Sequence, residues 1–318
     1  MANWVAAFLI IITLELGIST SAATLNETCL GADISFQLQF NLYQNSCPEA
    51  ESIVFSWVQS AVAVDPRMAA SLLRLHFHDC FVNARDDTAT FQGEKTAPPN
   101  LNSLRGFEVI DAIKSDLESV CPETVSCADV LAIAARDSVF LTGGPSWEVQ
   151  MGRKDGVSVA VLLANFQNVG LSLNDVVALS GAHTIGKARC SSFSSRISGG
   201  AGGGPDINLD FVQSLQQLCS SPDLSTTATT AAVAELDKGT PFTFDNQYYT
   251  NLLSGEGLLP SDQALAGQDQ ETRMIVETYV EDSDRFFEDF KASMVRMGSL
   301  VGVVGNTGEI RRNCRFVN

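Results

Sequence analysis

Arginine and histidine side chains in the stretch 72–82, LLRLHFHDCFV, have the types and the spacing for proton-transfer chemistry. Arg74 and His78 are four residues apart, so on a helix they lie on the same face. His76, two residues before His78, must point elsewhere. An imidazole can accept and return a proton while a permanently charged guanidinium stabilises developing negative charge. The other interpretation of this stretch is a helix end with buried structural histidines.

A second block with a histidine is 179–190, LSGAHTIGKARC. Ser180 and Gly181 are typical of the end of a helix, so His183 would be held next to a helix break. Taken alone, a single histidine of this kind is usually structural, and Asp262 is predicted to be only a loop carboxylate. The role of either residue therefore depends on the sequence around it.

The composition limits the class of protein. The 318 residues are 45% hydrophobic, enough for one large domain or two closely packed lobes. The net charge of −17 argues against binding to nucleic acid or to an anionic membrane surface. The eight cysteines are dispersed without a CxxC pair, which favours disulfides in an oxidising compartment over a zinc site.

The first residues are typical of a secretory signal. The apolar run Trp4–Leu14 is too short to span a bilayer comfortably, and small residues that suit cleavage follow it. No Lys or Arg precedes the run, and a buried strand is the alternative interpretation. We expect a signal peptide over 1–23, a leader over 24–36 and a folded domain over 37–318, with no membrane-spanning segment.

Helical periodicity dominates that domain. Candidate capping pairs precede three of the helical segments. They are Ser46 with Glu49, Ser126 with Asp129, and Ser172 with Asp175. The first expected helix follows Ser46 and carries Ile53, Trp57 and Ala61 on one face. A second starts after Asp65-Pro66 and carries the Arg74/His78 face; the others cover 107–120, 126–139, 172–180, 211–219 and, as one or two helices, 271–297. Because strict alternation of apolar and polar residues is nearly absent, the predicted fold class is all-α.

Taken in order, these blocks resemble the class III secretory plant haem peroxidases. The resemblance covers about 37–318 and rests on several motifs besides the two histidine blocks. They include NLNSLRGFEVIDAIK (100–114), VSCADVLAIAARDSV (125–139), TFDNQYY (243–249) and GEIRRNCRFVN (308–318). The resemblance implies a two-lobed, all-α fold with haem b between a distal and a proximal helix. It also implies a secreted, monomeric cell-wall enzyme that uses hydrogen peroxide and small phenolic donors.

The same resemblance implies a role for each site residue. His183 would ligate the haem iron, and Asp262 would accept a hydrogen bond from its other ring nitrogen. On the distal side, His78 would move protons and Arg74 would stabilise charge. Asn100 would accept a hydrogen bond from His78 and so leave the other nitrogen of His78 free as a base.

Calcium ions and disulfides are implied in the same way. The proximal calcium ligands would be oxygen donors, as a hard cation requires. They are Thr184, Asp237, Thr240, Thr243 and Asp245. The distal ion would be bound by Asp79 and the Val82 carbonyl, and Glu94 would link it to Asn100. The disulfides would be Cys47–Cys121, Cys127–Cys314 and Cys190–Cys219.

This chain departs from the family pattern at two points. After Asn83 the family continues with a Gly-Cys-Asp-x-Ser segment, which is missing here. Its loss removes the usual partner of Cys80 and three distal calcium ligands, so we expect one tightly bound calcium ion rather than two. A proline-rich segment at the donor entrance is missing after Asn165.

These gaps leave an alternative function open. The chain could be a secreted haem- or calcium-binding protein whose catalysis is impaired. A non-haem metal site on His76 and His78 is a more distant alternative, because alternate residues on a helix diverge.

Overall fold

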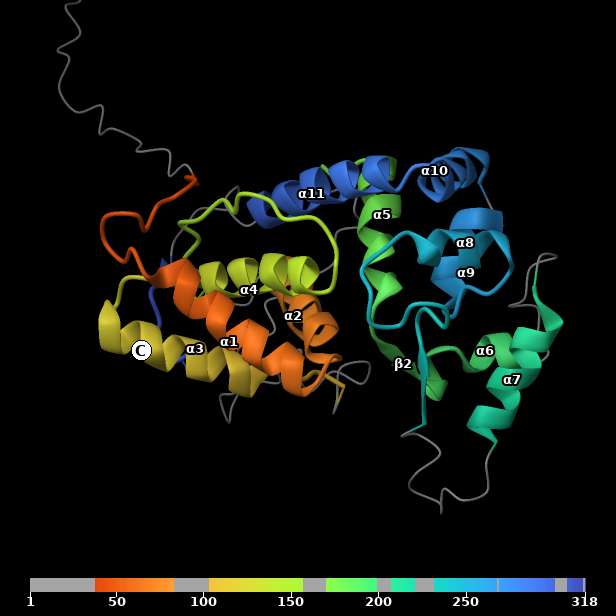
Figure 1. Cartoon of the computed structure of the whole chain (residues 1–318), viewed down its shortest axis with the longest axis horizontal. Helices are drawn as coiled ribbons and strands as arrows, with labels where there is room; N and C mark the ends of the chain where they lie inside the picture. Colours follow the sequence, from red (N-terminus) through yellow and green to blue (C-terminus); the bar gives the residue numbers. More distant parts are fainter. Residues whose placement is uncertain are drawn as a thin grey trace, which may run out of the picture. The chain divides into compact units, whose positions relative to one another are not determined.

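The computed structural model describes residues 38–82, 103–156, 170–198, 207–220, 232–267, 269–300, 308–316 and 318. All of them belong to the unit Phe36–Asn318 (Figure 1). The expected signal peptide and leader, both junctions at which the family pattern is interrupted, Glu94 and Asn100 lie outside the described residues. None of the described helices is both long and apolar enough to cross a membrane.

Helices account for most of the described chain, so the all-α fold class is confirmed. They are α1 (Ala50–Val64), α2 (Met68–Val82), α3 (Phe107–Val120), α4 (Cys127–Leu141), α5 (Leu173–Ser180), α6 (Ser194–Ile197), α7 (Leu209–Cys219), α8 (Gln247–Leu253), α9 (Pro260–Gly267), α10 (Gln270–Glu281) and α11 (Ser283–Ser299), with the 3₁₀ turns η3 (Gly181–Thr184) and η4 (Cys190–Ser192). Two short antiparallel ladders join β1 (Asp155–Gly156) to β4 (Gly308–Glu309) and β2 (Lys187–Arg189) to β3 (Val233–Glu235).

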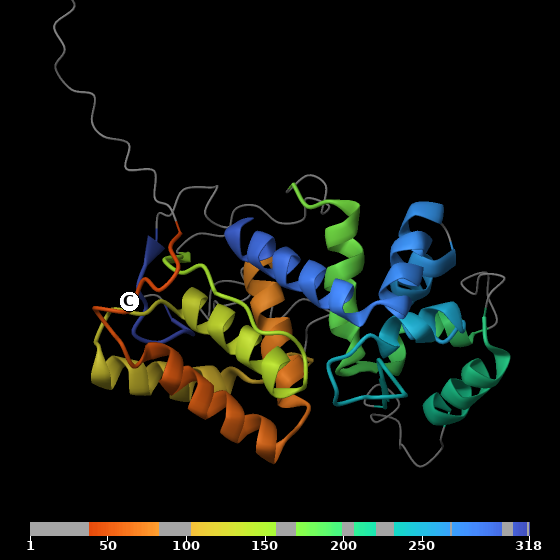
Figure 2. The same cartoon turned by 45° about the horizontal axis from the view of Figure 1, so that its top comes forward.

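The first hydrophobic core surrounds α4. Both α1 and α2 pack against α4, and α3 packs against α1 (Figures 1 and 2). Twelve of the fifteen residues of α4 are buried, because its sequence is apolar or small on nearly every side. Val54 and Val58 of α1 and Ile113 and Leu117 of α3 complete this core without solvent exposure.

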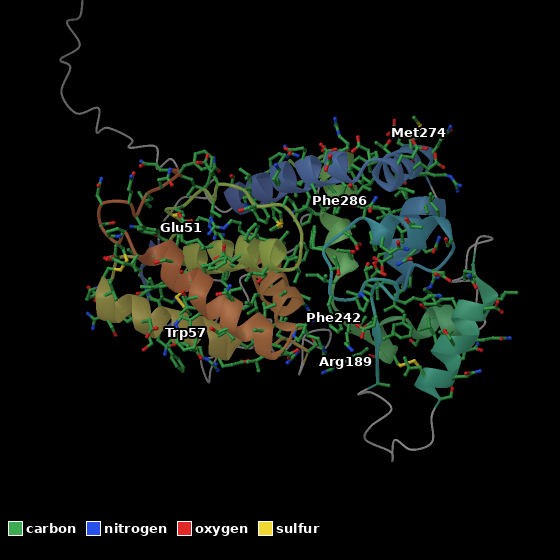
Figure 3. All side chains as sticks on the ribbon, viewed as in Figure 1. Glu51, Trp57, Arg189, Phe242, Met274 and Phe286 are labelled. Carbon is green, nitrogen blue, oxygen red and sulfur yellow. A yellow bond between two sulfur atoms is a disulfide. The ribbon has the colours of Figure 1, made fainter. Side chains whose placement is uncertain are left out.

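A second core, rich in aromatic residues, lies among α5, α8, α10 and α11. Within it, α11 packs on α5, and α10 packs on α8 and α9. The Phe286 ring, labelled in Figure 3, lies 5.0 Å from the Tyr249 ring between centroids. A Cβ at Gly181 would lie 2.3 Å from Tyr249 Oη and 2.5 Å from the Phe286 ring. Gly181 therefore lets the end of α5 approach this aromatic core.

Two of the three expected capping pairs are present. Ser126 accepts from the Asp129 N–H at the start of α4, and Ser172 and Asp175 form a complete capping box on α5. The expectation for Ser46 and Glu49 is wrong, because α1 begins only at Ala50 and its N-cap side chain makes no capping bond. The preceding turn takes that role: the Ala50 N–H donates to the Cys47 carbonyl at 3.0 Å.

The structure contains the disulfides Cys47–Cys121, Cys127–Cys314 and Cys190–Cys219. Cys127–Cys314 joins residues 187 apart and attaches the C-terminal segment to the first residue of α4. Beside it, the buried Asp155 carboxylate accepts from the backbone N–H groups of Cys127, Ala128 and Arg311. The start of the central helix is thus capped by groups that the C-terminal segment holds in place.

Candidate active site

Arg74 and His78 meet on one face of α2, as their spacing predicts. The Nε–H of Arg74 donates to His78 Nε2 at 3.1 Å. Because a guanidinium can only donate, Nε2 is the unprotonated nitrogen and the ring proton is on Nδ1. Nδ1 is buried and has no hydrogen-bond partner among the described residues. The basic nitrogen of His78 is therefore Nε2, and in this structure its lone pair accepts from Arg74.

The electrostatics keep this imidazole neutral. Burial and, after it, the charge of Arg74 lower the pKa of His78 to about 4. Arg74 is itself held by Ser103, whose hydroxyl accepts from Nη2 at 3.2 Å. The pair thus offers a base beside a fixed positive charge at neutral pH.

His76 points in another direction. Its Nδ1 lies 3.8 Å from the Cys80 sulfur, and His76, Asp79 and Cys80 place their potential ligand atoms within 4.8 Å of one another. A guanidinium lies against this cluster: Arg153 Nη1 is 3.3 Å from Asp79 Oδ2 and 3.7 Å from Cys80 Sγ. Because that positive charge would repel a metal ion, the cluster is poorly suited to bind one.

His183 lies in η3, directly after the end of α5. Its Nδ1 is 2.8 Å from Asp262 Oδ1. Asp262 is in the first turn of α9, so its expected position in a loop is wrong. The hydroxyl of Tyr248 donates to the same carboxylate at 3.1 Å, and the Leu259 N–H donates to its other oxygen at 2.9 Å. The carboxylate is therefore fixed from several sides while it orients the histidine.

The remaining nitrogen of His183 is suited to a metal. Burial lowers the pKa of His183, but the charge and hydrogen bond of Asp262 outweigh it and hold the pKa above its usual value. Arg74 opposes that rise, so the two side chains lie within electrostatic range of each other. The ring is 36% exposed, and Nε2 makes no hydrogen bond to a described residue. An oriented imidazole with one available nitrogen is a common axial ligand of haem iron.

Oxygen ligands converge beside this histidine. Thr184 Oγ1 lies 3.3 Å from Asp237 Oδ2 and 3.1 Å from Asp245 Oδ1, and Thr240 Oγ1 lies 3.2 and 3.1 Å from the same two atoms. Each hydroxyl has one proton, so at most two of these four contacts are hydrogen bonds and the others bring lone pairs together. Neither carboxylate forms an ion pair with a described residue. A hard cation among these oxygens would turn the repulsion into attraction.

Comparisons with known proteins decide the family. The model of the family described as Peroxidase matches residues 54–282. The chain is 56% identical to Peroxidase 40 of Arabidopsis thaliana over 338 residues, covering 95% of each chain. It is 47% identical to Peroxidase 4 of Vitis vinifera (89% of this chain, 93% of the relative) and 46% identical to Peroxidase N of Armoracia rusticana (89% and 91%). The chain belongs to the peroxidase family.

With these plant relatives, the protein is a haem peroxidase of the class III type, an oxidoreductase that acts on hydrogen peroxide and a reducing substrate. The alignment with Peroxidase 40 also indicates whether internal segments are missing from this chain. Since 95% of this chain is about 302 residues, the 338 aligned positions exceed what the chain supplies. This excess is expected if the relative contains internal segments that this peroxidase lacks.

Of the residues that the family resemblance assigns to calcium, those expected on the distal side are only partly described by the structure. Asp79 is buried and paired with Arg153, Val82 is the last residue of α2, and Glu94 lies outside the described residues. Thr243 belongs to the same loop as Asp237, Thr240 and Asp245, and its N–H donates to the Thr240 carbonyl at 3.0 Å.

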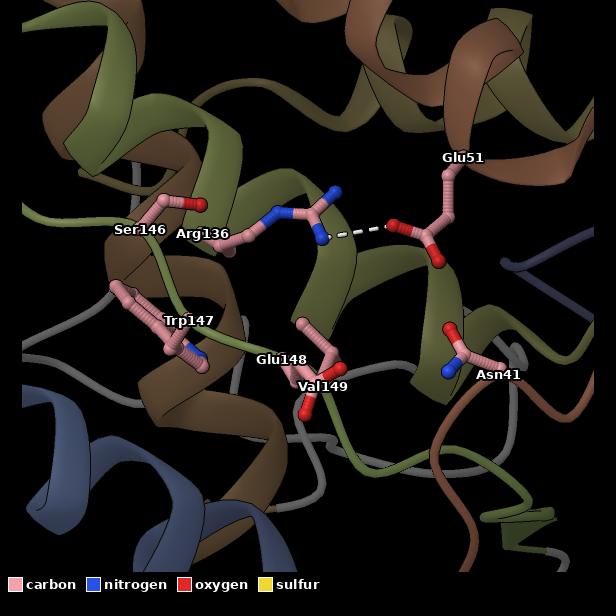
Figure 4. Close-up of a pocket in the computed structure, with 7 residues that line it drawn as sticks. All are labelled: Asn41, Glu51, Arg136, Ser146, Trp147, Glu148 and Val149. Atoms are coloured by element: carbon pink, nitrogen blue, oxygen red, sulfur yellow. Dashed lines mark hydrogen bonds and ion pairs between the residues drawn. The ribbon is translucent and has the colours of Figure 1, made fainter.

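A separate cavity of about 410 Å³ opens between α1, α4 and the segment before β1 (Figure 4). Arg136 reaches across it to Glu51, and the two charged groups are 2.7 Å apart. None of the expected catalytic or haem-binding residues lines this cavity.

Three contributors to the peroxidase site were missed by sequence reasoning. Ser103 holds Arg74, Tyr248 holds Asp262, and Arg153 neutralises Asp79. Ser103 and Tyr248 lie within blocks that resemble the family, but none of the three residues has a local spacing that points to its partner.

Proposed function

We propose that His183 binds the haem iron through Nε2, with Asp262 orienting the ring and Arg74 and His78 acting on the opposite side. When bound, the haem supplies the iron at which peroxide is reduced and stores the oxidising equivalents. The observation that carries this assignment is the 2.8 Å contact of His183 Nδ1 with Asp262 Oδ1, because it orients the ring and leaves Nε2 without a hydrogen bond to a described residue.

The distal residues would then move one proton. Once the Arg74 Nε–H turns from His78 Nε2 toward the peroxide, Nε2 takes a proton from the near oxygen and returns it to the far oxygen, which leaves as water. Arg74 stabilises the charge that separates along the O–O bond. Asn100 is the proposed acceptor for the buried Nδ1–H, which has no partner among the described residues.

The reducing substrate would be a small phenol that gives up one electron at a time. The signal-like segment at 1–23, the three disulfides and the plant relatives support secretion into the cell wall. We expect a monomeric domain over 37–318 that binds neither nucleic acid nor membrane, in keeping with the charge of −17.

One calcium ion would be bound tightly, at the proximal oxygen ligands. Asp237 and Asp245 supply two carboxylates there, and Thr184 and Thr240 face both of them. On the distal side the carboxylate of Asp79 is already paired with Arg153, and the missing segment removes further ligands.

Substitution of the proposed iron ligand tests the assignment. His183→Ala should abolish stable haem binding, seen as loss of the Soret band, while the protein is still secreted and folded by circular dichroism. His76→Ala is the matched control and should keep the Soret band, because His76 faces Cys80. Full haem occupancy with an unchanged spectrum in His183→Ala would contradict the proposal.

A further inference from the structure

Three of the four tyrosines of the chain form a continuous row that starts at the proximal histidine. The Tyr248 ring lies 6.1 Å from the His183 ring between centroids. Tyr249 follows at 5.1 Å from Tyr248, and Tyr279 at 5.0 Å from Tyr249. All three contacts are edge-on or tilted and lie in the second core. The row thus leads from the proposed iron ligand through α8 to α10.

The three phenols differ in where their proton could go. Tyr248 donates to Asp262, which already holds His183, so a proton left there would disturb the ligand. Tyr249 donates to the Val177 carbonyl at 3.0 Å, and an amide carbonyl is a poor base. Tyr279 donates at 2.9 Å to Asp289 Oδ2, a carboxylate whose side chain is 16% exposed and which is also paired with Arg285 at 2.8 Å. Only Tyr279 therefore has an ionised acceptor that is in contact with solvent and independent of the haem ligand.

We propose that this row carries an electron from Tyr279 to the haem site when no external donor is bound. Peroxide leaves two oxidising equivalents at the haem, and one electron from Tyr279 consumes one of them. The Oη–H bond of Tyr279 breaks, its proton goes to Asp289, and a neutral phenoxyl radical remains. A later one-electron donor reduces that radical, and Asp289 returns the proton. Tyr248 and Tyr249 serve as the aromatic bridge.

A competing route exists in the same core. The ring centroids of Trp147 and Phe290 are 6.1 Å apart. Phe290 packs in turn against Phe286, whose ring packs against Tyr249. This branch needs two phenylalanines, whose rings have no acidic proton and are far harder to oxidise than a phenol. The row of tyrosines is therefore the preferred route, and Trp147 is the site that an experiment must distinguish from it.

The inference is tested by freeze-quench electron paramagnetic resonance on the haem-loaded protein, mixed with equimolar peroxide without donor. We expect a tyrosyl signal that narrows when the protein carries ring-deuterated tyrosine. Tyr279→Phe should remove the signal while keeping the ring in the core. Asp289→Asn should also remove it by taking away the proton acceptor. Tyr43→Phe is the matched control and should change nothing, because Tyr43 donates to Asp129 in the other core.

The outcomes separate this inference from the proposed function on which it depends. Each preparation is also assayed with peroxide and a small phenol. A preparation that turns over the phenol but shows no tyrosyl radical contradicts the inference alone. A signal that persists in Tyr279→Phe, or one assigned to tryptophan by deuterated tryptophan, would likewise overturn it.

Discussion

The two histidines that face the proposed haem site have opposite environments. On the distal side, burial and then the charge of the neighbouring Arg74 lower the pKa of His78 to about 4. His183 on the proximal side is paired with the Asp262 carboxylate, which outweighs partial desolvation of the ring and holds its pKa above the usual value. The same side chain is thus prepared for different tasks, because a neutral base must accept a proton whereas an iron ligand benefits from added electron density. The neighbouring charge, rather than the histidine itself, determines the role.

The largest expected effect comes from removing the distal base. His78→Ala should slow the reaction with peroxide by about 10²–10⁴-fold, the range for a positioned general acid–base. Stopped-flow absorbance in the Soret region measures this rate. His76→Ala is the control and should mainly lower stability, since His76 is buried away from Arg74. Equal rates for the two variants would show that the distal base is misassigned.

On the proximal side, removing the negative charge should have a smaller effect. Asp262→Asn keeps the size of the side chain but not its anionic character, so His183 becomes less electron-rich. We expect haem to be retained and turnover to fall by about 10–100-fold, as is typical for groups that support a metal ligand. Spectroelectrochemistry should show a more positive iron reduction potential; an unchanged potential would mean that Asp262 does not tune the ligand.

Acid should slow the reaction with peroxide only at a pH low enough to protonate His78. His78 is neutral above its lowered pKa, so its basic form persists from neutral pH down to about pH 4 and is lost below it. The rate with peroxide should therefore be level near neutrality and fall as the pH drops through about 4. The Soret spectrum recorded over the same range shows whether haem is still bound. A rate that already halves near pH 6.5, the ordinary value for histidine, would contradict the assigned environment.

The smallest expected effect is on the calcium content of the protein, which should differ by a single ion per chain. After exhaustive dialysis we expect about one calcium per chain, bound at the proximal ligands. Asp237→Asn should release it, whereas Asp79→Asn should leave the count unchanged because Asp79 is paired with Arg153. Two tightly retained ions in the unmodified protein would show that the distal site survives.

Local pattern predicted the long helices well. The periodicity of 107–120 gives the bounds of α3, and the Ser126 and Ser172 caps mark the starts of α4 and α5. It missed α8 and α9, which have only seven and eight residues and no long apolar face. Pro260 at the first position of α9 was the available signal.

Contacts between residues far apart in the sequence could not be predicted from the local pattern of residues. His183 and Asp262 are 79 residues apart, and nothing in their spacing joins them. Their pairing was predicted only through the resemblance to a family. The Arg74–His78 contact needed no such help, because four residues along one helix bring the two side chains together. The bond between Arg153 and Asp79 was not predicted by either kind of reasoning.

The attachment of the C-terminal segment to the start of α4 has a consequence for biosynthesis. Cys314 and the Arg311 backbone are translated long after α4, yet they complete the cap of a helix whose first residue lies 187 positions before Cys314. The first core can collapse around α4 before this segment has left the ribosome, but the cap can close only afterwards. Oxidation of Cys127 with Cys314 is therefore a late step, and it must take place where an oxidant is available.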